Sequence, residues 1–257
     1  PDPKDNRLRA SAIVETEDAR ILIDCGPDFR AQVLHLPFEK IDGVLITHEH
    51  YDHVGGLDDL RPFCRFGAVP IYAEEYVARA LRLRMPYCFV DHRYPGVPDI
   101  PLQEIEVGHA FSIHHTEVVP LRVMHGRLPI LGYRIGRLAY LTDFKTIGDA
   151  EVEKLRGVEV LVVNALRFTE HYSHFNVAEA LELGARVLDA EGAVESARCG
   201  KLAEREGGTG THADDSGGDA LECVGCGRAD FADCGHAGGD GAFRALDTGL
   251  GGIGQFI

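Results

Sequence analysis

Short apolar, β-branched runs alternate with stretches of helical spacing through residue 183 of the chain. The apolar runs, many of them bounded by Gly, Pro or Asp, predict buried strands at residues 10–15, 20–24, 41–47, 69–73, 102–107, 117–124, 132–135, 138–142 and 158–164. Apolar residues at helical spacing predict helices at residues 27–36, 55–66, 74–84, 150–155 and 177–188. Alternation of this kind predicts an α/β fold in which helices cover sheets.

The pattern changes from Gly184 onward. Residues 184–257 hold 18 of the 30 glycines, and only 13 of these 74 residues are Val, Ile, Leu, Met, Phe, Trp or Tyr. That fraction is too low for an ordinary packed core, and no strand or long helix is predicted between Gly207 and Gly241. We therefore expect one folded domain over residues 1–183. The tail, residues 184–257, is expected to be disordered or a non-native continuation, such as a shifted reading frame produces.

Composition and charge narrow the class of protein. The 257 residues carry 26 basic against 41 acidic side chains, a net charge of −15, which argues against a large nucleic-acid footprint because phosphate binding needs clustered Lys and Arg. No apolar stretch approaches the roughly 18 residues of a membrane span. Seven cysteines without repeated spacing, and no visible secretory leader, favour reduced thiols and a cytoplasmic location.

Residues 47–56 form the most informative segment, THEHYDHVGG. It follows a predicted buried strand directly and places three imidazoles and a carboxylate within six residues: His48, His50, Asp52 and His53. Such side chains bind Zn, Mn or Fe, and the rigid end of a strand can aim them at a common point. The alternative, a solvated histidine-rich turn, does not account for this spacing.

This segment resembles the signature motif of the metallo-β-lactamase superfamily. The resemblance covers about residues 5–183 and implies an α/β sandwich, two mixed sheets between helices, with two metals at one edge. Two further strand ends match in order: RVMHG, which contains His125, and LTD, which contains Asp143. The chain departs from the family at both ends. It begins after the usual first strand and glycine-rich turn, and the closing Thr-His strand is replaced by Thr211-His212 behind a glycine-rich run.

The segments HGRLPILGY and SHFNVAEAL resemble the phosphodiesterase branch, which includes phosphoribosyl cyclic phosphate phosphodiesterase and the tRNA 3′-processing endonuclease. The resemblance implies two divalent ions, Zn or Mn. Its implied metal ligands are His48, His50, Asp52, His53, His125 and Asp143, with Asp143 bridging both ions. It also implies catalytic roles for His174 and Asp52. Asp24 is expected to orient a metal-binding histidine, since ligating imidazoles usually donate their second N–H to an oxygen.

These features favour a metal-dependent phosphodiesterase that cleaves a small cyclic or linear phosphodiester with a water acidified by the metals. Three alternatives stay open. They are a decayed or truncated member that binds metal weakly without turnover, an RNA 3′-processing endonuclease, and a thioesterase or lactonase with the same metals. The expected partner is a small phosphodiester, with no large nucleic acid and no membrane, and a homodimer is left open.

Overall fold

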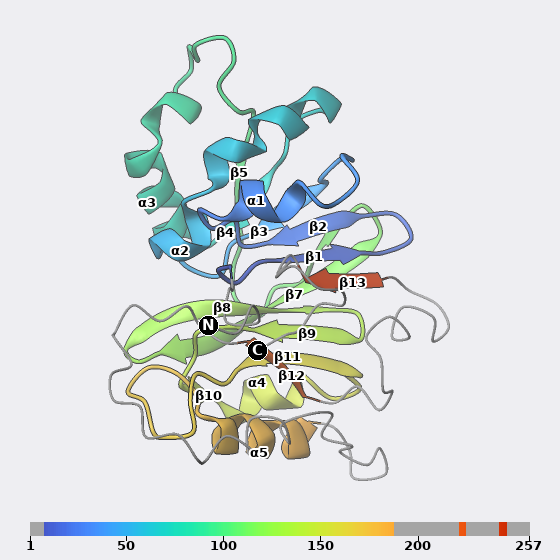
Figure 1. Cartoon of the computed structure of the whole chain (residues 1–257), viewed down its shortest axis with the longest axis vertical. Coiled ribbons are helices and arrows are strands. Elements are labelled where there is room, and N and C mark those ends of the chain that lie inside the picture. Colours follow the sequence, from blue (N-terminus) through green and yellow to red (C-terminus); the bar gives the residue numbers. More distant parts are fainter. Residues whose placement is uncertain (1–7, 188–220, 225–241, 246–257) are drawn as a thin grey trace.

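The structure, a computed structural model, describes residues 8–187 and two strands further along the chain, Leu221–Val224 and Ala242–Ala245. The described elements form two mixed β-sheets that pack face to face, with helices on both outer sides (Figure 1). This arrangement confirms the predicted α/β sandwich.

The first sheet has the strand order β13-β1-β2-β3-β4-β5. Its strands are β1 (Ala12–Glu15), β2 (Arg20–Ile23), β3 (Gly43–Leu45), β4 (Ile71–Ala73), β5 (Leu102–Glu104) and β13 (Ala242–Ala245). The pairs on either side of β1 are antiparallel, and β2 through β5 run parallel. Parallel neighbours bring the ends of β2 and β3 to the same edge of the sheet.

The second sheet has the order β10-β7-β8-β9-β11-β12, with β6 paired to β7. Its strands are β6 (Phe111–Ile113), β7 (Thr116–His125), β8 (Leu128–Ile135), β9 (Leu138–Leu141), β10 (Thr146–Ile147), β11 (Val160–Asn164) and β12 (Leu221–Val224). Among the described strands of this sheet, only β9 and β11 pair in parallel. Gly136-Arg137 makes the predicted two-residue hairpin between β8 and β9, with Gly136 at φ +56°, as such turns require.

Helices cover the outer face of each sheet (Figure 1). The first sheet carries α1 (Phe29–Val33), α2 (Tyr51–Val54) and α3 (Glu75–Arg84), together with 3₁₀ turns at Leu57–Phe66 and Pro86–Cys88. The second sheet carries α4 (Asp149–Glu153) and α5 (Val177–Val187). None of the helices in the described ranges is long and apolar enough to cross a bilayer.

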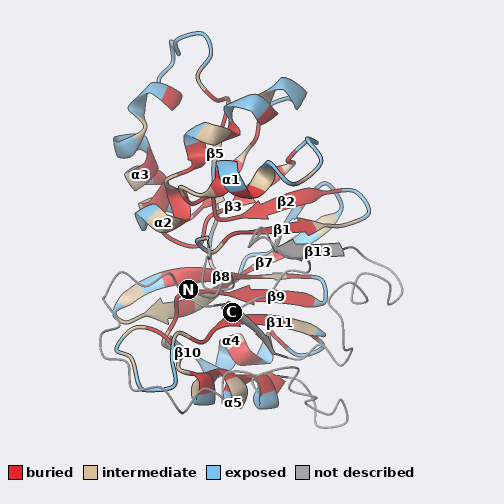
Figure 2. Cartoon of the chain, in the orientation of Figure 1, coloured by how far each residue is buried: buried red, intermediate tan, exposed pale blue. Residues whose placement is uncertain are grey.

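Alternation along the strands divides the core into three layers. In β2, Leu22 packs toward the first set of helices, whereas Ile21 and Ile23 join the layer between the sheets. In β11, Val162 lies between the sheets and Leu161 packs toward α4 and α5. Figure 2 shows the strands buried at the centre and exposed residues on the outer helices. Burial on both faces explains why these strands are apolar throughout.

Three sequence expectations need correction. The helix predicted for residues 55–66 is a 3₁₀ stretch, and Pro62 within it removes a backbone donor that an α-helix needs. Strands β6 and β10 were not predicted, because each is too short to show a period. The expectation of no strand between Gly207 and Gly241 is wrong at Leu221–Val224, which pairs with β11. Four residues between polar and glycine-rich flanks give a strand signal too weak to recognise.

Strand β13 pairs with β1, and β12 pairs with β11, so each sheet has a further described strand beside the predicted ones. Helix α5 continues to Val187, beyond the domain boundary expected at residue 183. Thr211-His212 lies outside the described residues. The division into residues 1–183 and 184–257 stays a prediction.

Candidate metal centre

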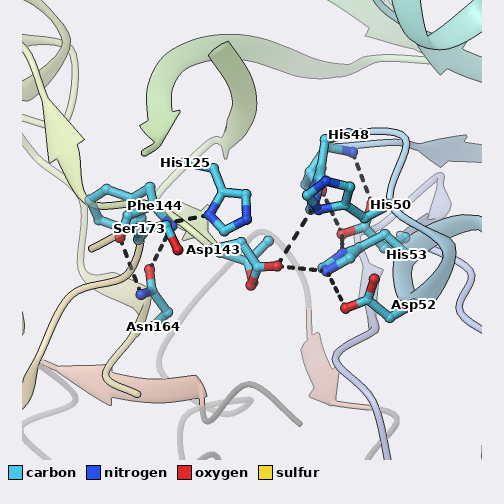
Figure 3. A network of polar contacts seen from close by, with 12 residues as sticks. His48, His50, Asp52, His53, His125, Asp143, Phe144, Asn164 and Ser173 are labelled. Carbon is cyan, nitrogen blue, oxygen red and sulfur yellow. Dashed lines mark hydrogen bonds and ion pairs between the residues drawn. The ribbon is translucent and has the colours of Figure 1, made fainter. Parts of the chain in front are cut away.

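The histidines and aspartates predicted from the motifs converge at one edge of the two sheets (Figure 3). His48 and His50 lie between β3 and α2, and Asp52 and His53 are in α2. His125 is the last residue of β7, and Asp143 follows β9. The first sheet and α2 therefore contribute one half of the site, and the second sheet contributes the other half.

The centre of this cluster is formed by His48, His53 and Asp143, which are at most 2% exposed. Asp143 Oδ2 lies 2.9 Å from His53 Nε2 and 3.7 Å from His48 Nε2. One ligand atom from each residue lies within 4.8 Å of the other two, so the three can contact a single ion.

The other predicted ligands surround this centre. His50 Nδ1 lies 3.0 Å from His48 Nε2, and Asp52 Oδ2 lies 3.4 Å from His53 Nε2. The His125 ring centroid is 5.3 Å from that of His50 and 5.8 Å from that of His48. All six predicted ligands are therefore brought together, and the group whose ligand atoms all lie within 4.8 Å of one another consists of His48, His53 and Asp143.

Protein oxygens hold the second ring nitrogen of three of these histidines. His48 Nδ1 lies 2.9 Å from the Thr47 hydroxyl, His53 Nδ1 lies 2.7 Å from Asp24 Oδ2, and His125 Nδ1 lies 3.2 Å from the Ser173 carbonyl oxygen. Contacts of this kind fix a ring's orientation and leave Nε2 for an ion. Asp24 thus contacts a histidine of the cluster, as expected from its place at the end of a predicted strand.

Two buried carboxylates of the site have unusual backbone conformations. Asp24 and Asp143 follow β2 and β9 with φ of +57° and +53°, and His114 is the only other described non-glycine residue with positive φ. A left-handed backbone conformation is uncommon for residues other than glycine, and it occurs more often at functional sites than elsewhere. Asp24 also accepts hydrogen bonds from the Thr47 backbone N–H and hydroxyl, both at 2.8 Å.

The electrostatics of the cluster favour a cation. Burial, with His53 nearby, holds the pKa of His48 well below its usual value, so its ring is neutral and can donate a lone pair. Burial alone would lower the pKa of His53 too, but Asp143 and Asp24 outweigh it and raise that pKa well above its usual value. The buried carboxylates of Asp24 and Asp143 therefore stabilise a positive charge near the Nε2 atoms of His48 and His53.

The residues therefore fit a divalent metal ion. Imidazole nitrogens and carboxylate oxygens are ordinary ligands of Zn²⁺ and Mn²⁺, the outer nitrogens of three rings are held in place, and the buried negative charge needs compensation. His48, His53 and Asp143 would form the core of the site, with His50, Asp52 and His125 close enough to complete it.

His174 lies beside this cluster, in the segment that leads into α5. Its ring centroid is 4.6 Å from that of His125, and it is 9% exposed. The backbone N–H of Phe175 donates to the Phe144 carbonyl at 2.9 Å, which ties the segment to the residue after Asp143. The structure therefore places His174 next to the predicted ligands.

Three further residues, which the motifs do not predict, support the cluster. The Thr142 hydroxyl donates to Asp143 Oδ1 at 2.8 Å, and Asn164 exchanges hydrogen bonds with the backbone of Phe144 at 3.1 and 3.2 Å. Ser173 contributes the carbonyl that contacts His125. Asn164 could have been recognised in the sequence, because it is a polar residue at the end of the apolar run VLVVN. The contacts of Ser173 had no counterpart in the sequence.

Comparisons with known proteins agree with this architecture. An octanoyltransferase from Porphyromonas gingivalis is 46% identical over 183 residues, which is 70% of this chain and 37% of that protein. A ribonuclease Z from Bacillus licheniformis is 30% identical over 155 residues, 58% of this chain and 48% of that protein. The chain thus spans less than half the length of these two relatives.

A crystal structure of a diphosphatase from the PhnP family is similar with a TM-score of 0.66 and 37% identity, over 72% of this chain and 71% of that chain. This similarity confirms the resemblance drawn from the motifs. The sequence profile of the beta-lactamase superfamily domain matches residues 19–193, well over half of the chain. With the two-sheet sandwich and the His–Asp cluster at its edge, this match shows that the chain belongs to the beta-lactamase superfamily domain family.

Proposed function

We propose that this protein is a metal-dependent hydrolase that cleaves a small cyclic or linear phosphodiester. The observation that carries the proposal is the convergence of His48, His53 and Asp143, with His174 next to the same cluster. A cluster of nitrogen and oxygen ligands beside a separate, well-anchored imidazole offers both a metal site and a proton donor.

His48, His50, Asp52, His53, His125 and Asp143 would hold two divalent ions, Zn or Mn. When bound, such ions lower the pKa of a shared water and neutralise charge on phosphate oxygens. Asp24, Thr47 and Ser173 keep the ligand rings oriented. Hydrogen bonds from His53 hold the pKa of Asp52 below its usual value, so this carboxylate is charged and ready to bind a cation.

His174 is the proposed proton donor. It is not among the predicted ligands, and its ring packs edge to face against that of His125. An imidazolium here can donate a proton to the leaving oxygen of a phosphodiester, the step that otherwise leaves an unstable alkoxide.

The diphosphatase of the PhnP family supports phosphorus–oxygen bond cleavage, since it is 37% identical and covers 72% of this chain. A substrate with a diphosphate linkage therefore belongs in the same test. The similarity to a ribonuclease Z keeps RNA 3′-end processing as the second candidate, but a net charge of −15 disfavours a large RNA partner. The similarity to the octanoyltransferase covers 37% of that protein and carries no proposal of octanoyl transfer.

The test is hydrolysis of bis(p-nitrophenyl) phosphate by protein that has been stripped of metal and then supplied with Mn or Zn. We expect turnover that needs added metal and is lost in His53→Ala. A cyclic ribose phosphate diester, a dinucleoside diphosphate, a short RNA and a thioester, assayed in parallel, separate the substrate classes. Metal binding without turnover on any substrate would favour the decayed-member alternative and contradict the proposal.

The division into a metal-binding domain at residues 1–183 and a tail, the absence of a membrane partner, the cytoplasmic location and a homodimer remain proposals. Native mass spectrometry of the full chain at several concentrations tests the last of these.

A further inference from the structure

Two histidines contact each other in the segment before α5, outside the predicted ligand set. His171 Nδ1 lies 3.0 Å from His174 Nδ1, and the ring centroids are 4.9 Å apart. Two ring nitrogens at this distance share one hydrogen, so one donates and the other accepts. Which nitrogen carries the hydrogen decides which tautomer His174 adopts.

The backbone settles the direction of this hydrogen bond. The backbone N–H of Ser173 donates to His171 Nδ1 at 3.3 Å, so that nitrogen presents a lone pair and carries no hydrogen. The hydrogen in the contact between the rings therefore belongs to His174 Nδ1, and His171 accepts it. Sequence spacing alone gives no indication of this polarity.

This direction assigns a task to each nitrogen of His174. With Nδ1–H donated to His171, the neutral His174 ring carries its lone pair on Nε2, which is a buried nitrogen. The Ser173 carbonyl oxygen also contacts His125 Nδ1 at 3.2 Å, so Ser173 connects the His171–His174 pair to the predicted metal ligands. An acceptor behind an imidazole fixes its tautomer and orientation in the same way as the carboxylate of a catalytic triad.

We propose that His171 is a positioning residue that holds His174 in its Nδ1–H form and fixes the orientation of its ring. The catalytic part of this inference rests on the proposed function, because it requires His174 to donate a proton. The tautomer part does not, since it concerns hydrogen bonds within the chain alone.

Ser173 offers a competing acceptor, because its hydroxyl lies 3.1 Å from His174 Nδ1. Three variants separate the two. His171→Phe keeps a ring against His174 without the nitrogen, and His171→Asn supplies an oxygen acceptor as a conservative rescue. Ser173→Ala removes the hydroxyl and keeps the backbone N–H and carbonyl. If His171 is the acceptor, His171→Phe changes the tautomer of His174, whereas His171→Asn and Ser173→Ala leave that tautomer unchanged.

The tautomer is read by ¹⁵N NMR of the histidine rings in the metal-free full-length protein. We expect the wild-type His174 ring to be protonated at Nδ1, and His171→Phe to lose this preference while His171→Asn retains it. An Nε2–H tautomer in the wild type, or a preference lost in Ser173→Ala and kept in His171→Phe, would overturn the inference. This outcome does not depend on whether the protein has phosphodiesterase activity.

The catalytic part is tested with two leaving groups, in methyl phenyl phosphate and methyl p-nitrophenyl phosphate. p-Nitrophenolate leaves without a proton, whereas phenolate benefits from one. His171→Phe should lower kcat by about 10–100-fold on the phenyl ester, the usual effect of removing a supporting partner, and by much less on the p-nitrophenyl ester. Metal content should not change, and His171→Asn should restore the rate.

An equal loss on both esters would mean a structural role and would contradict the proposal, as would no loss on either ester. If the wild-type protein with metal hydrolyses neither ester nor bis(p-nitrophenyl) phosphate, the proposed function fails, and the tautomer measurement still decides the contact between His171 and His174.

Discussion

Asp24 accepts a hydrogen bond from the ring of His53 at 2.7 Å, and both side chains are almost completely buried. The same carboxylate accepts two hydrogen bonds from Thr47, so one side chain at the end of β2 holds the segment that leads from β3 into α2. The orientation of the motif histidines is therefore set by a strand that lies outside the motif.

Replacing Asp24 tests this connection. Asp24→Asn keeps the shape and tolerates the left-handed backbone, but it removes the charge that faces His53. We expect metal affinity to fall by about 10–100-fold, measured by calorimetric titration of the metal-free protein. Asp91→Asn, a change at an exposed carboxylate, is the control. Equal affinity in the two variants would contradict the role of Asp24.

The metal site itself is tested at His50. His50→Ala should abolish stoichiometric metal, because His50 is one of the six predicted ligands and its Nδ1 lies 3.0 Å from His48 Nε2. Elemental analysis after dialysis gives the readout. His109→Ala, at a ring that is 77% exposed, should keep the wild-type metal content. A full equivalent retained by the His50 variant would show that the assignment is wrong.

His174 should matter for turnover more than for metal content. His174→Ala should lower kcat by roughly 10²–10⁴ on a substrate with a poor leaving group, the usual contribution of a general acid. Its metal content should equal that of the wild type, because the ring packs beside His125 and is not among the predicted ligands. Steady-state kinetics with an alkyl diester and parallel elemental analysis check both parts. An unchanged kcat would exclude the role.

Backbone packing beneath α2 gives a prediction about stability. A Cβ atom at Gly26 would lie 2.0 Å from the Asp52 carbonyl oxygen. Because this oxygen belongs to the backbone, the clash could be relieved only by moving a backbone segment. Gly26→Ala should destabilise the fold by about 1–3 kcal/mol, as overpacking does, and should displace Asp52. Gly148→Ala is the matched control, since nothing lies within 4 Å of its Cβ position. Urea denaturation of both variants compares them.

Acid should weaken a surface connection between the two sheets. The backbone N–H of His115 donates to Asp18 and, with hydrogen bonds from Thr116, the His115 ring and Thr16, lowers the pKa of Asp18 from 3.8 to about 2. A carboxyl with a lower pKa in the folded state adds stability above its unfolded pKa and loses it as pH falls toward its folded pKa. The stability advantage of the wild type over Asp18→Asn should therefore shrink between about pH 4 and pH 2. Urea denaturation across that range measures it, and a constant difference would contradict the assignment.

The sequence by itself determined most of the strands and the residues of the site. Strands buried on both faces must be apolar throughout, so runs such as that of β11 are visible without a structure. The metal-binding chemistry of residues 47–56 can be read locally, because consecutive ligands lie one or two positions apart in the sequence. His125 and Asp143 could be placed only because each lies at a recognisable strand end.

Only the tertiary structure decided which residues support the cluster. Asp24 lies 29 positions from His53, and Ser173 lies 48 positions from His125; no local period relates residues so far apart. Strand β12 likewise depends on its pairing with β11, since four residues have little preference of their own. The direction of the hydrogen bond between His171 and His174 follows from one backbone N–H. The sequence thus determines the chemistry available, and the packing of the two sheets decides which nitrogen and oxygen atoms meet.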